Sequence, residues 1–188
     1  MKLLLISGSE KSAESLSALL KEVRIASVLT VKSGGEARRI LLDNDFDIIL
    51  INTPLTDEFG NELAAALTET TASSVIMLVR HDIADGVAQK MERFGVLVIE
   101  KPVGKIILHQ TIRLAAAARN RLLGIKQDNI RLQQKIEEIR LVDRAKCVLI
   151  QYLNMTEEQA HKYIEKQAMN TRMTRKDIAV SILKSYEI

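Results

Sequence analysis

Basic side chains in the second half of the chain are the groups whose number and position could support chemistry with a polyanion. Residues 105–188 contain 16 Lys and Arg against 9 Asp and Glu, whereas residues 1–104 contain 11 against 15. A basic segment behind an acidic one indicates that only the basic segment meets a polyanion. Solvated helix faces would produce the same balance, so charge alone leaves both interpretations open.

Side chains that can hold phosphate or a base edge gather in the last fifty residues. Lys and Arg bind phosphate, Arg can also stack on or hydrogen-bond an exposed base, and Gln can read a base edge. For Arg144, an ion pair with Asp143 or Glu137 is an equal alternative. Tyr163 could stack on a base, although core packing is its favoured role. The candidate residues are Arg144, Lys146, Gln167, Arg172, Arg175 and Lys176.

The sequence shows few of the side chains that catalysis or metal binding requires, and few long apolar segments. Cys147 is the only cysteine, and the three histidines show no metal-ligand spacing. The sequence has no nucleophile–base pair and no phosphate-cradling glycine loop, so we expect no catalytic residue, metal or cofactor, and no enzyme activity. No apolar run approaches the roughly 18 residues of a membrane span, and the opening KLLLI is too short for a signal peptide. A cytoplasmic protein without a membrane partner is expected.

Short apolar runs alternate with helical patterns over the first half of the chain. This alternation predicts a doubly wound α/β domain with five parallel strands, whose chemistry would sit at the carboxyl ends of the strands. Strands are expected at Lys2–Ser7, Ser27–Lys32, Asp47–Asn52, Val75–Val79 and Val96–Ile99. Helices are expected at Ser12–Val23, Gly34–Asn44, Asn61–Thr70 and Ala84–Phe94.

The five strand–helix units and the Lys101–Pro102 pair after the fifth strand resemble a response-regulator receiver domain. The resemblance covers residues 1–104, or residues 1 to about 120 if a fifth helix is included. The resemblance implies an acidic pair after strand one, a phosphate-accepting Asp after strand three, a hydroxyl after strand four and a Lys after strand five. Here the acidic pair is replaced around Ser7–Ser9, the acceptor position holds Asn52, and the hydroxyl position falls near Val79. Only Lys101 matches the pattern.

An amide neither ligates magnesium well nor attacks phosphorus, so we expect a pseudo-receiver without aspartyl-phosphate chemistry. Lys101 is then expected to bond the carbonyl of Asn52 as a structural strut. Asp57 and Glu58 are more consistent with loop and helix-start charges than with a metal site. A sensor kinase or another upstream protein is a possible partner.

One long helix is expected from Gly104 to Arg140, followed by a helical Leu141–Leu153. The second half of the long helix carries a heptad seam of apolar residues with one Asn at a core position. This pattern favours a coiled-coil homodimer. Packing of the helix inside its own subunit is the alternative. The seam could be extended back through Ala118, Ala115, Thr111 and Leu108. The seam residues are Leu122, Ile125, Asn129, Leu132, Ile136 and Ile139.

Three short helical patterns close the chain. The first carries an apolar stripe that includes Val148 and Tyr152. Thr156 with Gln159 forms a capping-box pattern for the second, and Thr174 with Asp177 opens the third. An all-α three-helix unit is therefore expected at residues 141–188, joined by a coiled-coil linker at 121–140 to the receiver-like domain at 1–120.

Residues 132–182 resemble the ANTAR family, the RNA-binding output domain of antitermination regulators. The motifs are Asp143-Arg144-Ala145-Lys146, Thr156 to Ala160, Gln167-Ala168-Met169, Arg172, and Arg175-Lys176-x-Ile178-Ala179. The resemblance implies binding to paired stem-loops in messenger RNA leaders, which prevents a terminator hairpin. Cys147 stands where the family usually has Gly, and we expect it to be a tolerated packing change. The alternatives are a DNA-binding response regulator and a dimeric scaffold controlled by a protein partner.

Overall fold

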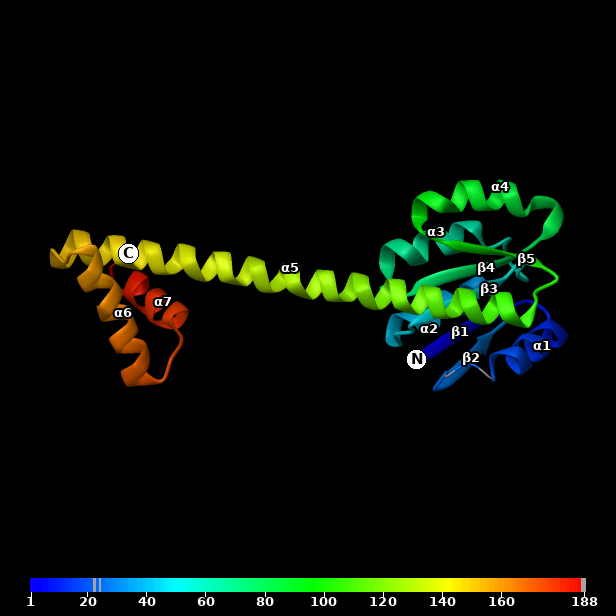
Figure 1. The fold of residues 1–188 in the computed structure, drawn as a ribbon, viewed down its shortest axis with the longest axis horizontal. Coiled ribbons are helices and arrows are strands. Elements are labelled where there is room, and N and C mark those ends of the chain that lie inside the picture. The colour runs from blue at the N-terminus through cyan, green and yellow to red at the C-terminus, as the bar shows by residue number, and fades with distance from the viewer. Residues whose placement is uncertain (22, 24, 187–188) are drawn as a thin grey trace. The chain divides into compact units, whose positions relative to one another are not determined.

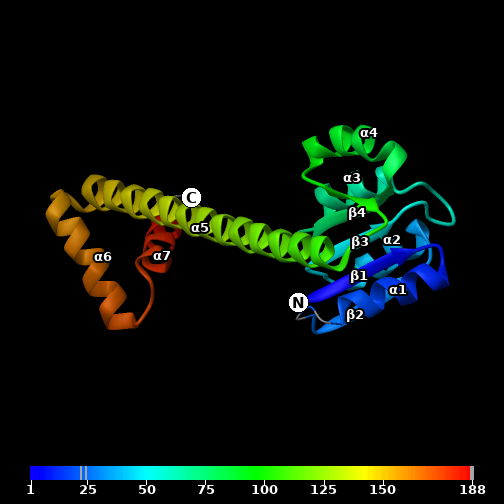
Figure 2. The same ribbon diagram turned by 45° about the vertical axis from the view of Figure 1, so that its right-hand side comes forward.

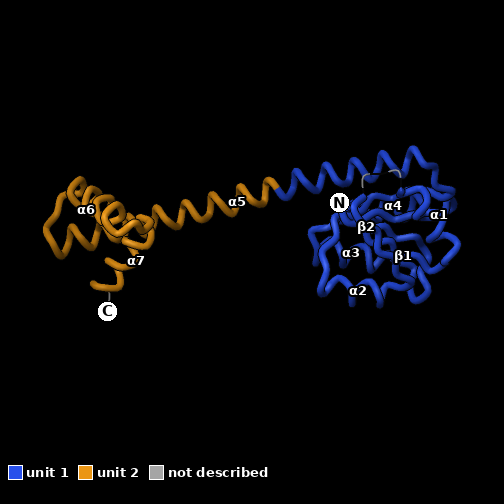
Figure 3. The backbone as a smooth tube through the Cα atoms, turned by 90° about the horizontal axis from the view of Figure 1, so that it is seen from below, with its two compact units in different colours: residues 1–123 blue, residues 124–188 orange. Residues whose placement is uncertain are grey.

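The computed structural model describes residues 1–188 except residues 22, 24, 187 and 188. It divides into two compact units, Met1–Leu123 and Gly124–Ile188 (Figure 3). Helix α5 (Lys105–Leu153) contributes its first part to unit 1 and the remainder to unit 2. Each unit has a hydrophobic core of its own, so the two are described separately.

Unit 1 is built on a five-stranded parallel sheet in the order β2-β1-β3-β4-β5 (Figure 1). Buried aliphatic runs, such as the fully buried LLLI of residues 3–6, form the central strands, as expected for parallel strands covered on both faces. This confirms the predicted doubly wound class. The strands are β1 (Lys2–Ser7), β2 (Ser27–Val31), β3 (Ile48–Asn52), β4 (Ser74–Arg80) and β5 (Leu97–Lys101).

Alternation along each strand sends neighbouring side chains to opposite faces of the sheet. Leu3 and Leu5 of β1 pack with α1 (Glu10–Leu20) and the first part of α5. Leu4 and Ile6 pack in the other core, together with residues of the remaining helices. Figure 2 shows the arrangement of these helices around the sheet. Those helices are α2 (Gly34–Asp43), α3 (Asn61–Thr70), α4 (His81–Met91) and the 3₁₀ turn η1 (Glu92–Phe94).

Some helices of unit 1 begin and end at other residues than predicted, and at the start of α1 the reason is a capping side chain. Helix α1 begins at Glu10 because the Ser9 side chain accepts a hydrogen bond from the Ser12 amide, two residues inside the helix. It ends at Leu20, whereas the sequence predicted Val23. Part of that predicted end, residue 22, lies outside the described residues.

Unit 2 packs the end of α5 against α6 (Glu157–Thr171) and α7 (Arg175–Tyr186). Ala145 and Leu149 of α5 are buried with Ile164 of α6 and Ala179 of α7 in its core. Helix α7 runs in the direction of α5, because Arg175 lies near Glu138 at its start and Tyr186 contacts Tyr152 at its end. None of the helices in the described part combines the length and apolar character that a membrane span requires.

Candidate functional site

A small polar network occupies the carboxyl edge of the sheet in unit 1. Ser7 and Asn52 are register partners on β1 and β3, and both side chains are buried. The Asn52 amide donates to Ser7 Oγ over 3.0 Å, and the Thr53 hydroxyl donates to the Leu78 carbonyl over 2.9 Å. These bonds satisfy the buried polar groups with neutral partners, and no carboxylate of the described residues takes part in them.

Lys101 completes this network from the end of β5. Its ammonium donates to Asn52 Oδ1 over 3.1 Å and to the Thr53 carbonyl, which is the strut expected from the sequence. Burial lowers the pKa of the Lys101 ammonium, and the charge of nearby Arg80 lowers it further. Both hydrogen-bond partners of the Lys101 ammonium are neutral oxygen atoms.

The carboxylates that follow β1 and β3 in the sequence, Glu10 and Asp57, bind groups outside this network. Glu10 is exposed and pairs with Lys32 over 2.8 Å. Asp57 accepts hydrogen bonds of 2.9 Å from the backbone amides of Gly34 and Gly35 at the start of α2, and these bonds lower its pKa. No group of three or more potential metal-ligating side chains occurs among the described residues.

Caps at both helix starts define the turns of unit 2. The Thr156 side chain accepts from the Gln159 amide while the Gln159 side chain accepts from the Thr156 amide, so the predicted capping box is present. The Asp177 amide donates to Thr174 Oγ1 at the start of α7. Between them, Arg172 takes the left-handed conformation with φ 55°, which ends α6 and leaves its side chain exposed.

Two of the predicted phosphate-binding side chains already have acidic partners. Lys146 lies 2.8 Å from Asp143 and 3.3 Å from Glu157, and these contacts, first of all Asp143, raise its pKa. Arg175 lies 3.7 Å from Glu138 and 3.8 Å from Glu165. A phosphate at either position must compete with carboxylates. Arg144 is exposed with a partner of its own, and Gln167 is half-buried.

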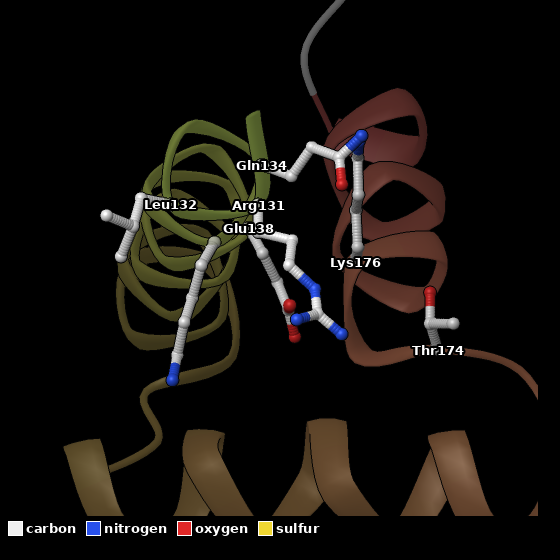
Figure 4. Close-up of a pocket in the computed structure, with 7 residues that line it drawn as sticks. Arg131, Leu132, Gln134, Glu138, Thr174 and Lys176 are labelled. Atoms are coloured by element: carbon white, nitrogen blue, oxygen red, sulfur yellow. The ribbon is translucent and has the colours of Figure 1, made fainter. Parts of the chain in front are cut away.

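A groove of about 560 Å³ lies between α5 and the start of α7. Arg131 and Gln134 extend from α5 toward α7, and Lys176 extends from α7 into the same space (Figure 4). Glu138 lines the groove as well, facing Arg175. The lining residues are Arg131, Leu132, Gln134, Lys135, Glu138, Thr174 and Lys176.

Comparison with known proteins assigns both units. The family model of the ANTAR domain matches residues 131–183. The transcriptional regulatory protein PdtaR of Mycobacterium tuberculosis, found in two strains, is 24% identical over 170 residues, which cover 90% of this chain and 83% of the relative.

Residues 131–183 form an ANTAR domain.

Solved structures add the fold of unit 1. A signal receiver domain of an HD domain-containing protein from Pseudomonas fluorescens Pf-5 is 17% identical, with a TM-score of 0.60, over 65% of this chain and 91% of that chain. A response regulator receiver domain protein from Clostridium thermocellum is 23% identical, with a TM-score of 0.58, over 64% and 98%. The ANTAR domain therefore follows a domain of receiver fold.

The heptad seam, which overlaps the start of the ANTAR domain, is exposed in the single chain. Leu122, Leu132 and Ile139 expose 67%, 61% and 53% of their surface, and Ile125, Asn129 and Ile136 are exposed too. The extension of the seam toward the N-terminus is wrong at two positions. Leu108 and Ala115 are buried in the core of unit 1, because the first part of α5 covers the sheet.

Three further side chains of the ANTAR domain differ from expectation. Cys147 is exposed, so its replacement of the usual Gly changes the surface of α5 and not its packing. Tyr163 is 37% exposed and lies outside the buried cluster, contrary to the favoured core role. The residues that directly follow Cys147 and Tyr163 in the sequence, Val148 and Ile164, are the ones buried in the core. Tyr152 of the predicted apolar stripe is 56% exposed, although its ring contacts Tyr186.

Sequence reasoning missed Arg131, Gln134 and Lys135. They precede the three short helices. The heptad places Arg131 and Gln134 at outer positions, which are usually solvated, and Lys135 at a flanking position that faces Arg140 of a parallel partner. The signal that could have found them is their spacing, because residues three and four apart share one face of a helix. That face is the one that meets α7.

Proposed function

We propose that this ANTAR regulator is an RNA-binding transcription antiterminator that acts on paired stem-loops in messenger RNA leaders. The observation that carries the proposal is the ANTAR match over residues 131–183, where exposed basic side chains surround the α6–α7 turn. Arg172 and Lys176 are exposed and form no ion pair in the described part of the chain, so phosphate can reach them. Such contacts give salt-dependent affinity for a polyanion.

Two copies would act together through the seam on α5. A long helix that leaves Leu122, Leu132 and Ile136 exposed to water gains free energy when these residues are covered, at roughly 25 cal/mol per Å² of apolar surface. Asn129 within the seam favours one register and two strands. A homodimer would place one ANTAR domain beside another, as recognition of two adjacent stem-loops requires.

The receiver fold would transmit its signal without aspartyl phosphate. Asn52 occupies the end of β3, its amide is bound to Ser7 and Lys101, and no carboxylate joins that network. We expect acetyl phosphate, a small phosphoryl donor, to leave the chain unmodified in intact-mass spectrometry. An adduct that maps to unit 1 would contradict this part of the proposal, and would then favour control by a sensor kinase.

A DNA-binding function is supported by one specific feature. Helices α6 and α7 are joined by a short turn, and Arg175 and Lys176 open the second helix, as in a helix-turn-helix. However, Arg175 is paired with Glu138 and Glu165, and Lys176 lies in the groove beside α5. These contacts turn the basic start of α7 toward its own unit, which disfavours entry into a major groove.

Equilibrium binding of the full chain tests the choice between RNA and DNA. The probes are an RNA with two adjacent stem-loops, selected from a pool with randomised loops, and DNA of the same sequence. We expect RNA to bind more tightly, and Arg172→Ala to weaken RNA binding by about tenfold. Lys90→Ala removes an equal charge from α4 of unit 1 and should bind like the wild type. Equal affinity for DNA, or an Arg172→Ala variant with unchanged affinity, would overturn the proposal.

A further inference from the structure

The groove between α5 and α7 carries an excess of positive charge without internal partners. Arg131, Lys135 and Lys176 form no ion pair within the described residues. The one carboxylate that lines the groove belongs to Glu138, which already faces Arg175 over 3.7 Å. The groove therefore presents three cations that form no ion pair among the described residues, although the charge of Lys176 also acts on the neighbouring Asp177 and lowers the pKa of that carboxyl.

We propose that this groove binds one unpaired nucleotide of an RNA hairpin loop, with its phosphate between Arg131 and Lys176 and its base edge against Gln134. The assignment rests on the proposed RNA-binding function and adds a specific site to it. Arg131 offers a planar fork of donors that fits phosphate oxygens, and Lys176 offers a mobile point charge. The phosphate would supply the negative charge that the protein itself does not place there.

Gln134 is the group in the groove that can read a base. Its amide offers both donors and an acceptor, the combination that hydrogen-bonds the edge of an unpaired base. Thr174 cannot share this role fully, because its hydroxyl donates to Asp177 Oδ2 over 2.6 Å and also accepts from the Asp177 amide. Base preference at this position should therefore depend on Gln134.

The size and form of the groove favour a single nucleotide over a duplex. Its volume of about 560 Å³ falls in the range of small-molecule sites, about 300–1,000 Å³. A paired stem presents a convex backbone that cannot enter a space of this size, whereas a base turned out of a loop can. Sequence-specific RNA recognition uses such unstacked loop bases.

The groove adjoins the seam on α5, since Leu132 belongs to both. Leu132, a seam residue, points away from α7, whereas Arg131 and Gln134 point toward it (Figure 4). A second copy paired along the seam would cover the groove at Leu132 and leave its α7 side, with Arg131 and Gln134, accessible. One loop nucleotide per chain matches the proposed recognition of two stem-loops by a dimer.

The test uses the full chain and a pool of RNA hairpins with a constant stem and a randomised loop. We expect Arg131→Gln to weaken binding by about tenfold and to reduce the slope of log affinity against log salt by about one. Gln134→Ala should change affinity much less but relax the preference for one base in the selected loops. The matched control is Lys184→Gln, an exposed Lys on the same helix as Lys176, which should keep wild-type affinity and loop preference.

Crosslinking provides a measurement that does not depend on variants. A photoreactive thiouridine placed in the selected loop should crosslink wild-type protein at peptides that contain residues 131–135 or 174–176. If wild-type protein binds the hairpins but both groove variants behave like Lys184→Gln, or crosslinks fall only on α6, the groove assignment is wrong and RNA binding stands. If wild-type protein binds the hairpins no better than DNA hairpins of the same sequence, the proposed function itself fails.

Discussion

Asn52 and Lys101 hold together the carboxyl edge of the sheet in unit 1. The Lys101 ammonium bonds the Asn52 amide oxygen and the Thr53 carbonyl. The Asn52 amide group in turn donates to Ser7, which occupies the end of β1. The edge is therefore held by hydrogen bonds between neutral groups around one half-buried cation, and we expect its role to be structural.

Replacement of Lys101 by Met tests this structural role. Met keeps the apolar stem but leaves Asn52 Oδ1 and the Thr53 carbonyl without their donor. We expect the free energy of unfolding to fall by about 1 kcal/mol, because the cost of leaving two buried acceptors without a donor exceeds the gain from no longer burying a charge. Chemical denaturation followed by circular dichroism measures the change. An unchanged or higher stability would show that the strut does not support the fold.

Individual exposures in the ANTAR domain could not be predicted from residue type. Cys147 and Tyr163 belong to types that are often buried or half-buried, yet both face solvent. The pairing of Lys146 with Asp143 and Glu157 was also unforeseen, because Glu157 comes from a different helix. Pairwise contacts across helices depend on how the helices pack, and a single sequence does not contain that geometry.

At the scale of elements, the loop after β3 is fastened to the start of α2. Asp57 bonds the two glycine amides that open α2, and Glu58 pairs with Arg38 on the same helix. These contacts agree with the interpretation of both carboxylates as loop and helix-start charges. They satisfy amides that the helix itself leaves without partners.

The pH dependence of this contact has a definite sign. The pKa of Asp57 is lower in the folded chain than its ordinary value, so its contribution to stability is present above that ordinary value and is lost as pH falls through the folded pKa. Asp57→Asn should therefore be less stable than the wild type at neutral pH. The difference should shrink in denaturation experiments at increasingly acid pH. A difference that grows toward acid would contradict the assignment.

The seam on α5 predicts an oligomeric state. Charges introduced at its centre would be buried without partners in a coiled coil, so Leu132→Asp combined with Ile136→Asp should convert dimers to monomers. Sedimentation of wild-type and variant chains at equal concentration measures this. Asp replacements at Arg131 and Gln134 would lie on the outer side of α5, away from the partner helix, and should leave dimers intact. Dimers that persist in the seam variant would show that another surface holds the copies together.

Element order and type followed directly from the sequence, whereas element ends did not. Aliphatic runs and apolar spacing located the five strands and the helices, because periodicity reports burial on one or two faces. The helix α4 was placed too late, since β4 runs to Arg80 and the helix begins at His81 without an intervening loop. The seam was extended too far, since a heptad pattern cannot tell a partner chain from a sheet on the same chain.

At the scale of the molecule, the charge asymmetry coincides with the division of labour between the units. Residues 1–104, which carry more acidic than basic residues, make up most of the receiver fold, and the ANTAR domain lies in the basic segment. The sequence could predict this division because the net charge of each segment is obtained by counting its charged residues, without knowledge of the fold. It could not predict the groove, because Lys176 joins Arg131 and Gln134 only after α7 has packed on α5.

The most direct test of RNA binding as the central activity is crosslinking of the full chain to nucleic acid in cells that express it, followed by sequencing. We expect the recovered molecules to be RNAs with two adjacent stem-loops ahead of a terminator hairpin, and we expect Arg172→Ala to recover far fewer of them. Recovery of genomic DNA, or of RNA without stem-loops and in equal amounts by wild type and variant, would contradict the proposed function.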